Sequence, residues 1–416
     1  MQHDIDNVSR RGFLKGALLG SAALAWGDRL ALAEQMAGEQ AITIKDIDSA
    51  GLPPGMIRMS SNENPLGPSP KAMEAVEKHM WSANRYAWYE EDARGRLQRL
   101  DPELELIRAL AKVDGIELPD GFDPDDETNP FFLAPGSGRI LKLLAIAYLS
   151  QGGGETIEAE VAYGDISEEA EVFNEAGMPT NIIRVPMTKD HRHDLDAMLK
   201  AITPKTTLLV ITNPNNPTGT LLSYQALEQF VSAVPKDVVV IIDEAYVHFV
   251  DDPNYRSAIS LATANDNVIV IRTFSKVYGI RGILLGYAVT SPTIKKKLAL
   301  YNSGRASAIA QIAGAAALGD LDHVQKSRQI VLDSKARLVK AFDEMGLEYI
   351  PSQSSFMMVN VKRDARTIRN EMWKQRVSIS NRGSAEMPGW LRISAGTMEE
   401  TEVFIQTLKR VLEKSS

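Results

Sequence analysis

The sequence predicts an α/β protein, in which helices cover a mostly parallel sheet and a smaller α+β domain follows. Length is the first observation, because 416 residues are too many for one compact core and favour two domains. The second is that continuous apolar runs, typical of buried strands, alternate with amphipathic helical segments after about Pro135. The third is a change of pattern after about Leu300, where helical stretches lead into short strands.

The segments before this alternation are predicted to be largely irregular. Ser60 to Pro70 is rich in Asn, Pro, Gly and Ser, which indicates an extended arm. Leu118 to Pro130 is acidic and contains three prolines, so it is predicted to be a surface loop. Gly136 to Leu149 begins with a Gly-Ser-Gly turn and continues as a helix.

Three β-branched runs predict buried strands, and each run ends in polar residues. The runs are Thr206 to Thr212, Asp237 to Tyr246 and Asn267 to Lys276, and the amphipathic helix Ser223 to Val234 lies between the first two. Ligands bind at the carboxyl ends of the strands in such sheets, so the functional site is expected there. The polar residues at these ends are Asn213, Asp243, Glu244, Ser275 and Lys276.

Helices and short strands make up the predicted second domain. Ala308 to Leu318 and Val324 to Met345 are predicted to be helical. Phe356 to Val361 and Trp390 to Ile393 are short apolar runs that predict strands. Together they indicate an α+β arrangement that is smaller than the preceding sheet.

Composition excludes several kinds of chemistry. The chain has no cysteine, so thiol catalysis, disulfides and thiolate metal sites are excluded. A net charge of −8 argues against a nucleic-acid-binding protein, which would normally carry a basic face. The only close pair of histidines, His191 and His193, lies among charged residues, which favours a solvated loop over a metal site.

The N-terminus resembles a twin-arginine export signal. Paired arginines in Ser9 to Lys15 precede the short apolar run Gly16 to Trp26, and Ala31 to Ala33 offers small residues at a cleavage site. An ordinary amphipathic N-terminal helix is the alternative. With a signal peptide at residues 1–33, the mature protein is expected to be periplasmic or secreted, without a stable membrane span.

The strand ends offer a complete set of groups for an aldehyde cofactor with a phosphate tail. Lys276 can form a Schiff base, although taken alone it is more simply a surface lysine. Asp243 offers a carboxylate for a ring nitrogen, and the polar turn Asn213 to Gly219 offers a donor for a phenolic oxygen. The Gly136 to Gly138 turn opens a helix, whose N-terminus suits a phosphate.

Five motifs carry a family resemblance from about Ser60 to Leu412: "NENPLGPSP", "NPNNPTG", "DEAY", "TFSK" and "LRISAGTMEE", in that order. The chain resembles the fold-type I pyridoxal-phosphate aminotransferases of class I/II, within them the histidinol-phosphate aminotransferase-like group. The resemblance implies an aspartate-aminotransferase-like fold, with a mostly parallel seven-stranded sheet in the large domain. It also implies pyridoxal 5'-phosphate as cofactor, amino-acid and 2-oxo-acid substrates, and a homodimer.

The resemblance also implies roles around the cofactor ring. Lys276 would bind the cofactor covalently and then move the proton during transfer of the amino group. Asp243 would pair with the ring nitrogen, while Asn216 and Tyr246 would donate to the phenolic oxygen. Tyr163 would stack on the ring face. The family usually has a proline two residues before this tyrosine, and Val161 stands there instead.

At the phosphate, the sequence departs from the family pattern. Family members usually carry an arginine eight residues after the lysine, and that position is Leu284. Arg281, five residues after the lysine, is the nearest arginine, although the two positions would face opposite sides of a strand. Arg281 could still replace the missing cation, or it could face substrate or solvent. The other residues implied at the phosphate are Ser137, Gly138, Thr273 and Ser275.

Three further residues are implied at the edge of the site. Tyr86 matches a tyrosine that reaches across the dimer interface, and Asn64 lies in the arm that borders the substrate. Arg392 would hold the substrate carboxylate with its bidentate fork. Four of the implied residues also have a structural alternative: Asp243 as a strand-end cap, Arg392 in a surface ion pair, and Tyr163 and Tyr86 as packing aromatics.

The resulting prediction is an exported pyridoxal-phosphate aminotransferase. Its expected parts are the signal peptide at 1–33, an arm at 34–72, a cofactor-binding domain at 73–300 and a small domain at 301–416. One alternative is another use of the same cofactor, such as amino-acid oxidation, elimination or racemisation. The other is a non-catalytic binding protein on the same fold.

Overall fold

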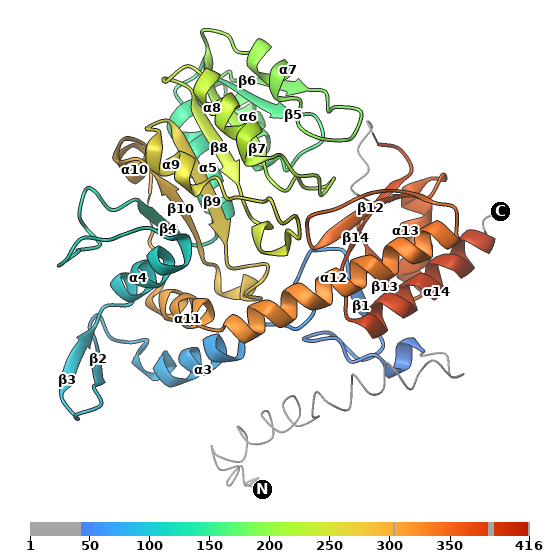
Figure 1. Cartoon of the computed structure of the whole chain (residues 1–416), viewed down its shortest axis with the longest axis horizontal. Coiled ribbons are helices and arrows are strands. Elements are labelled where there is room, and N and C mark those ends of the chain that lie inside the picture. Colours follow the sequence, from blue (N-terminus) through green and yellow to red (C-terminus); the bar gives the residue numbers. More distant parts are fainter. Residues whose placement is uncertain (1–42, 303, 382–386, 415–416) are drawn as a thin grey trace, which may run out of the picture. The chain divides into compact units, whose positions relative to one another are not determined.

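The computed structural model describes residues 43–302, 304–381 and 387–414, and the chain from Ile44 onward forms one compact unit (Figure 1). The predicted signal peptide and the first residues of the predicted arm lie outside the described residues. The predicted domain boundaries after residues 72 and 300 stay predictions. None of the helices in the described ranges is long and apolar enough to cross a membrane.

Seven strands form the central sheet. In spatial order they are β4 (Phe131–Ala134), β10 (Gly286–Thr290), β9 (Val268–Thr273), β8 (Val239–Asp243), β7 (Thr206–Thr212), β5 (Glu155–Ala159) and β6 (Asn181–Val185). The strand β10 runs antiparallel to both of its neighbours, and every other pairing in this sheet is parallel. The predicted fold class is therefore confirmed.

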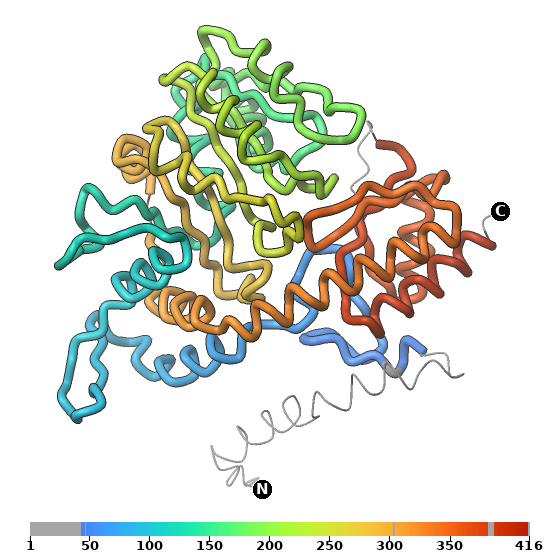
Figure 2. Tube along the Cα trace, viewed as in Figure 1, coloured from blue at the N-terminus to red at the C-terminus, as the bar shows by residue number. Residues whose placement is uncertain are grey.

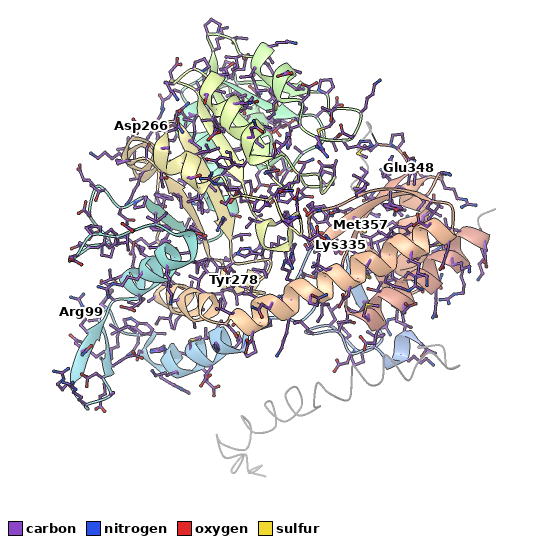
Figure 3. The ribbon with its side chains drawn as sticks, in the orientation of Figure 1. Arg99, Asp266, Tyr278, Lys335, Glu348 and Met357 are labelled. Atoms are coloured by element: carbon purple, nitrogen blue, oxygen red, sulfur yellow. The ribbon has the colours of Figure 1, made fainter. Side chains whose placement is uncertain are left out.

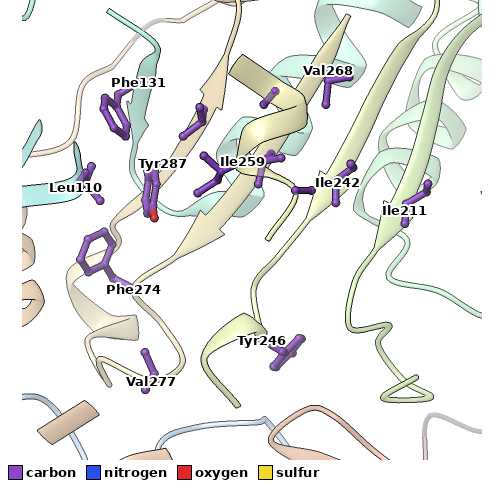
Figure 4. Close-up of a cluster of buried hydrophobic side chains, with 14 of the residues drawn as sticks. Leu110, Phe131, Ile211, Ile242, Tyr246, Ile259, Val268, Phe274, Val277 and Tyr287 are labelled. Atoms are coloured by element: carbon purple, nitrogen blue, oxygen red, sulfur yellow. The ribbon is translucent and has the colours of Figure 1, made fainter. Parts of the chain in front are cut away.

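Helices cover both faces of this sheet. They are α4 (Pro102–Asp114), α5 (Ser137–Leu149), α6 (Asp165–Glu175), α7 (Leu195–Lys200), α8 (Tyr224–Ala233), α9 (Ile259–Ala264), α10 (Pro292–Ala299) and α11 (Ala308–Leu318). Ile211 and Ile242 enter a layer with α4, α8 and α11, and Figure 4 shows them on adjacent strands. Val210 and Ile241 enter the opposite layer with α5, α6 and α10, because successive strand residues face opposite sides. Burial of each such side chain stabilises the fold by roughly 1.5–3 kcal/mol.

A second, antiparallel sheet follows later in the chain. It consists of β11 (Glu348–Ile350), β12 (Phe356–Asn360) and β14 (Trp390–Ser394), with β12 in the middle. Three helices accompany it: α12 (Leu321–Glu344), α13 (Ala365–Lys374) and α14 (Met398–Lys414). On α12, the buried Lys335 donates to the Ser352 carbonyl at 2.7 Å, just before β12 (Figure 3). This bond ties the long helix to the second sheet.

From Ile44 onward, the N-terminal arm is anchored by buried residues such as Ile47, Ile57 and Met59. After the short turn η1 (Ile44–Asp46), β1 (Ile57–Met59) pairs in parallel with β13 (Val377–Ile379), so segments far apart in sequence lie together (Figure 2). As predicted, residues 60–69 contain no helix or strand. The arm then meets the turn after Lys276 so closely that a Cβ on Gly279 would lie 2.0 Å from the Gly67 carbonyl oxygen. The arm therefore borders the predicted site.

The segment between α3 (Pro70–His79) and α4 contains a hairpin that was not predicted from the sequence. The turn η2 (Met80–Ser82) leads into the paired strands β2 (Trp88–Glu91) and β3 (Leu97–Leu100). Its strands are short and mostly exposed. Few buried apolar residues mark them, so their sequence lacks the pattern that revealed the central strands.

A buried ion network ties β8 and β9 to α4. Arg272 bonds to Asp114 at 2.6 Å and to Glu244 at 2.8 Å, and both carboxylate side chains are fully buried. Tyr255 and the Ala258 amide also donate to Glu244. The network fixes the carboxyl ends of two strands that reach the predicted site.

Removal of the cation from this network is expected to destabilise the fold strongly. Arg272→Met should lower the free energy of unfolding by about 3–5 kcal/mol, because it leaves two buried carboxylates uncompensated. Lys296→Met is the matched control, since Lys296 and Glu127 form an exposed pair worth about 0–1 kcal/mol. Urea unfolding of both variants measures the difference. Equal losses of unfolding free energy in the two variants would contradict a stabilising role for the buried network.

Candidate active site

A cavity of about 390 Å³ opens at the carboxyl ends of β7, β8 and β9, beside the first turn of α5. Its size falls within the range of small-molecule sites. The structure brings ten of the predicted residues together around it: Ser137, Gly138, Tyr163, Asn216, Asp243, Tyr246, Thr273, Ser275, Lys276 and Arg281. The parallel sheet explains this convergence, because it places successive strand ends at one edge.

The chain around Lys276 is held in a defined turn. The Thr273 hydroxyl accepts a hydrogen bond from the Ser275 amide at 3.1 Å and donates to the Ser275 hydroxyl at 3.0 Å. Gly279 has a φ of 70° and packs against the arm, where a side chain would not fit. The Lys276 Nζ lies 5.4 Å from the centre of the Tyr246 ring, so the amine faces the cavity.

Asp243 lies fully inside the protein at the end of β8. Burial raises the pKa of its carboxyl from 3.8 to about 7, while the Ala245 amide, which donates to it at 3.0 Å, opposes the rise. The nearby Asp165 carboxylate raises the pKa further, and the Lys276 ammonium lowers it. A cationic ring nitrogen beside Asp243 would favour its charged form.

This raised pKa predicts a pH dependence for the cofactor-free protein. The folded state binds the Asp243 proton more tightly than the unfolded chain, so the free energy of unfolding should fall as pH rises from 3.8 to about 7. Asp243→Asn should remove this part of the decline. Denaturant unfolding of both proteins at about pH 5 and about pH 8 tests it. An identical pH dependence in the two proteins would show that another group is responsible.

Asn216 connects the cavity to Arg392. The Arg392 guanidinium donates to the Asn216 side-chain oxygen at 2.7 Å and to the Ser60 carbonyl at 2.8 Å. Arg392 is buried on β14 and does not line the cavity itself. This bond orients the Asn216 amide, so that its NH₂ group is the part left for a ligand in the cavity.

The first turn of α5 forms the end of the cavity that suits an anion. The helix starts after Gly136, which has a φ of 88° and, as a glycine, provides no side-chain cap. Gly286 packs so closely that a Cβ there would lie 2.3 Å from the Ser137 nitrogen. The N–H groups of Ser137 and Gly138 at this helix start, together with the hydroxyls of Ser137, Thr273 and Ser275, can hold a phosphate.

Arg281 and Leu284 both line this cavity. The sequence suggested that they lie on opposite faces of a strand, but Arg281–Ile283 forms the 3₁₀ turn η4. Leu284 follows with a φ of 60° and is 43% exposed. The tight turn brings both side chains to one side, which a strand would not do.

Several charged residues of the cavity wall were not predicted from the sequence. Arg139 and Lys142 both line the cavity from the first turns of α5. Asp165, at the start of α6, also lines it. A helix that begins at the cavity necessarily places its first turns there. The position of Arg139 in the first turn of the predicted helix is therefore the sequence signal that could have identified it.

Three predicted residues do not line the cavity. Tyr86 is fully exposed before the β2–β3 hairpin. The Asn64 amide donates to the Val277 carbonyl at 2.7 Å and to the Ser327 hydroxyl at 2.8 Å, so it braces the turn after Lys276. Arg392 is linked to the cavity through Asn216. Their predicted roles stay predictions.

The prediction of a solvated loop is wrong for His193. This side chain is buried, and one ring nitrogen lies 3.1 Å from the Thr212 carbonyl oxygen. Burial lowers its pKa to about 4, so the ring is neutral near pH 7. His193 supports the polar turn that carries Asn216, and the surrounding charged sequence concealed this packing.

The fold and the cavity define a class of protein, the fold-type I pyridoxal-phosphate enzymes. The chain belongs to the aminotransferase class I and II family, which matches residues 54–408. It is 34% identical to the histidinol-phosphate aminotransferase of Moorella thermoacetica, over 86% of each chain. It is 35% identical to histidinol-phosphate aminotransferase 1 of Cupriavidus pinatubonensis, over 86% of this chain and 89% of that one.

Solved structures share the fold. The histidinol-phosphate aminotransferase of Sinorhizobium meliloti, in complex with pyridoxal-5'-phosphate, has a TM-score of 0.74 at 23% identity, covering 96% of this chain and 97% of that one. The aspartate aminotransferase of Thermus thermophilus with maleate has a TM-score of 0.69 at 20% identity, covering 86% and 91%.

The protein is therefore a pyridoxal-phosphate-dependent aminotransferase, which moves an amino group between an amino acid and a 2-oxo acid. The donor set of the cavity fits this cofactor, because it combines an amine, a buried carboxylate, amide and phenol donors and a helix N-terminus.

Proposed function

We propose that three residues divide the work of an amino-acid aminotransferase. Lys276 would hold the cofactor covalently, take the proton from the substrate α-carbon and return it on the cofactor side, while Asp243 would hold the ring nitrogen and Arg392 would bind the substrate carboxylate. When bound, pyridoxal phosphate supplies the electron sink for the reaction. One observation carries the proposal: Lys276 and Asp243 face one cavity, whose Asn216 is bonded to Arg392.

Three further lining residues orient the cofactor ring in this proposal. Asn216 and Tyr246 donate to its phenolic oxygen, and Tyr163 stacks on its face. Burial and the neighbouring carboxylates of Asp165 and Asp243 raise the pKa of Tyr163 far above 10.0, so it is a neutral phenol at neutral pH. A neutral ring suits stacking better than a phenolate, because it adds no negative charge beside Asp243.

A substrate screen tests the reaction. Purified protein is given single amino acids with single 2-oxo acids, and histidinol phosphate is included because the relatives above carry its name. Oxygen uptake is followed in parallel. Amino-group transfer with balanced amino-acid and oxo-acid products supports the proposal. Oxygen consumption with release of ammonia would indicate oxidation instead.

Arg281 is proposed as the full positive charge at the cofactor phosphate, since Leu284 cannot supply one. Arg281→Ala is expected to weaken cofactor binding by about 1.5–3 kcal/mol, the value of a charged hydrogen bond. Dialysis followed by absorbance measures the cofactor retained. Arg305→Ala, an exposed arginine outside the cavity lining, is the control. A greater loss with Arg139→Ala than with Arg281→Ala would assign the phosphate to Arg139.

A homodimer is proposed from the exposed aromatic residues near the hairpin. Tyr86 is fully exposed, and Trp81 and Tyr89 are 81% and 58% exposed. Such side chains in one segment are typical of an interface. Tyr86 is proposed to reach the cavity of the second subunit. Sedimentation of the parent and of Trp81→Ser tests the dimer, and a parent that sediments as a monomer contradicts it.

Export by the twin-arginine route is proposed from the arginine pair and the apolar run in residues 9–26. Replacement of Arg10 and Arg11 by lysine should keep the protein inside the cell. The experiment follows the protein in periplasmic fractions. Periplasmic protein in cells that lack the twin-arginine translocase would contradict this route.

A further inference from the structure

We propose that Asn62 is a positioning residue for Tyr246, and that Ser394 holds Asn62 in the required orientation. The proposal rests on the proposed role of Tyr246 as a donor to the cofactor. Asn62 lies in the N-terminal arm, Tyr246 follows β8 and Ser394 ends β14. Asn62 and Ser394 are 332 positions apart in the sequence.

Hydrogen bonds settle which way the Asn62 amide points. The Ser394 hydroxyl accepts from the Asn62 backbone amide at 2.9 Å and donates its proton to the Asn62 side-chain oxygen at 2.7 Å. The NH₂ end of the side chain therefore faces the Tyr246 hydroxyl, to which it donates at 2.9 Å. The opposite orientation would remove the oxygen that accepts the Ser394 hydroxyl proton.

This orientation determines what the Tyr246 hydroxyl can do. A phenol that accepts a hydrogen bond from an amide keeps its own proton for another acceptor. Tyr246 lines the cavity, where the proposed acceptor is the phenolic oxygen of the cofactor. Its ring is fixed by Phe356, edge-on at 5.0 Å between centroids, and by the Lys276 amine on its face. Asn62 thus sets the direction of the Tyr246 proton.

The backbone of Asn62 supports a specific role. Its φ is 55°, a left-handed conformation that non-glycine residues rarely adopt, and the residue is only 2% exposed. Asparagine tolerates this conformation better than most residues. The same arm contacts β14 a second time, where Arg392 donates to the Ser60 carbonyl. The arm is therefore part of the site wall.

The test uses Asn62→Gly, because glycine keeps the left-handed backbone while the amide is removed. The readout is the pH midpoint at which the absorbance of the bound cofactor changes. A donor to the phenolic oxygen stabilises the deprotonated form, so loss of that donor should raise the midpoint by about 0.5–1 pH unit. Asn62→Asp should raise it at least as much, since a carboxylate would take the Tyr246 proton.

A double-mutant cycle separates positioning from a merely structural role. Tyr246→Phe should raise the midpoint, and adding Asn62→Gly to it should cause no further shift. Ser61→Ala, in the same arm, should leave the midpoint unchanged. An unchanged midpoint in both Asn62 variants, or additive shifts in the double variant, would overturn the inference. A parent protein that shows no absorbance band from bound cofactor would contradict the cofactor assignment as well.

Discussion

Lys276→Ala is expected to abolish covalent attachment of the cofactor and to lower turnover by roughly 10³-fold or more. The variant loses the amine that bonds the cofactor and the base that moves the proton, so both functions fail together. The cavity itself should persist, because the Lys276 amine takes no part in the Arg272–Glu244 ion pair or in the Thr273–Ser275 bond that hold the strand ends. Weak, non-covalent cofactor binding should therefore remain.

Borohydride reduction followed by peptide mapping measures this attachment directly. In the parent protein, the reduced cofactor should be found on the peptide that contains Lys276. Lys142→Ala is the matched control, because it removes another cavity lysine whose partner is Glu169, and attachment should be retained. Cofactor on a different lysine in the parent protein would disprove the assignment.

Arg392→Ala is expected to lower kcat/KM for amino acids roughly 30- to 1,000-fold. This factor corresponds to a loss of about 2–4 kcal/mol of transition-state stabilisation. The cost includes the unpaired substrate carboxylate and the loss of the bonds to Asn216 and the Ser60 carbonyl. Cofactor retention should change less, because Arg392 is linked to the cavity through Asn216, one of several proposed cofactor residues, and the others stay in place. Arg392→Lys should also lose most of the effect, since lysine lacks the bidentate fork.

Saturation kinetics with one amino acid, together with cofactor retention, checks this prediction. Arg366→Ala is the control, because Arg366 is an exposed arginine on the neighbouring helix α13. An Arg392→Ala protein with parental saturation behaviour would show that another group binds the carboxylate. Equal loss of cofactor and substrate binding would point to a structural role for Arg392.

The sequence by itself determined the central sheet and the place of the site. Strands such as Thr206–Thr212 are continuous β-branched runs, so local hydrophobicity marks them, and the predicted bounds match the observed ones. Helix α11 likewise begins and ends at its predicted residues. Because parallel strands end at one edge of a sheet, the strand pattern alone was enough to place the polar residues after each run together.

Tertiary structure decided the contacts that depend on residues far apart in the chain. Asn62 meets Tyr246 across 184 positions, and nothing in the local arm sequence marks it over Asn64. His193 is buried although its neighbours are charged, because burial depends on the packing of whole elements. Arg281 and Leu284 share one cavity since a tight turn with a positive φ at Leu284 replaces the expected strand. Hydrophobic patterns report a local period, whereas these side-chain positions follow from the close approach of separate segments.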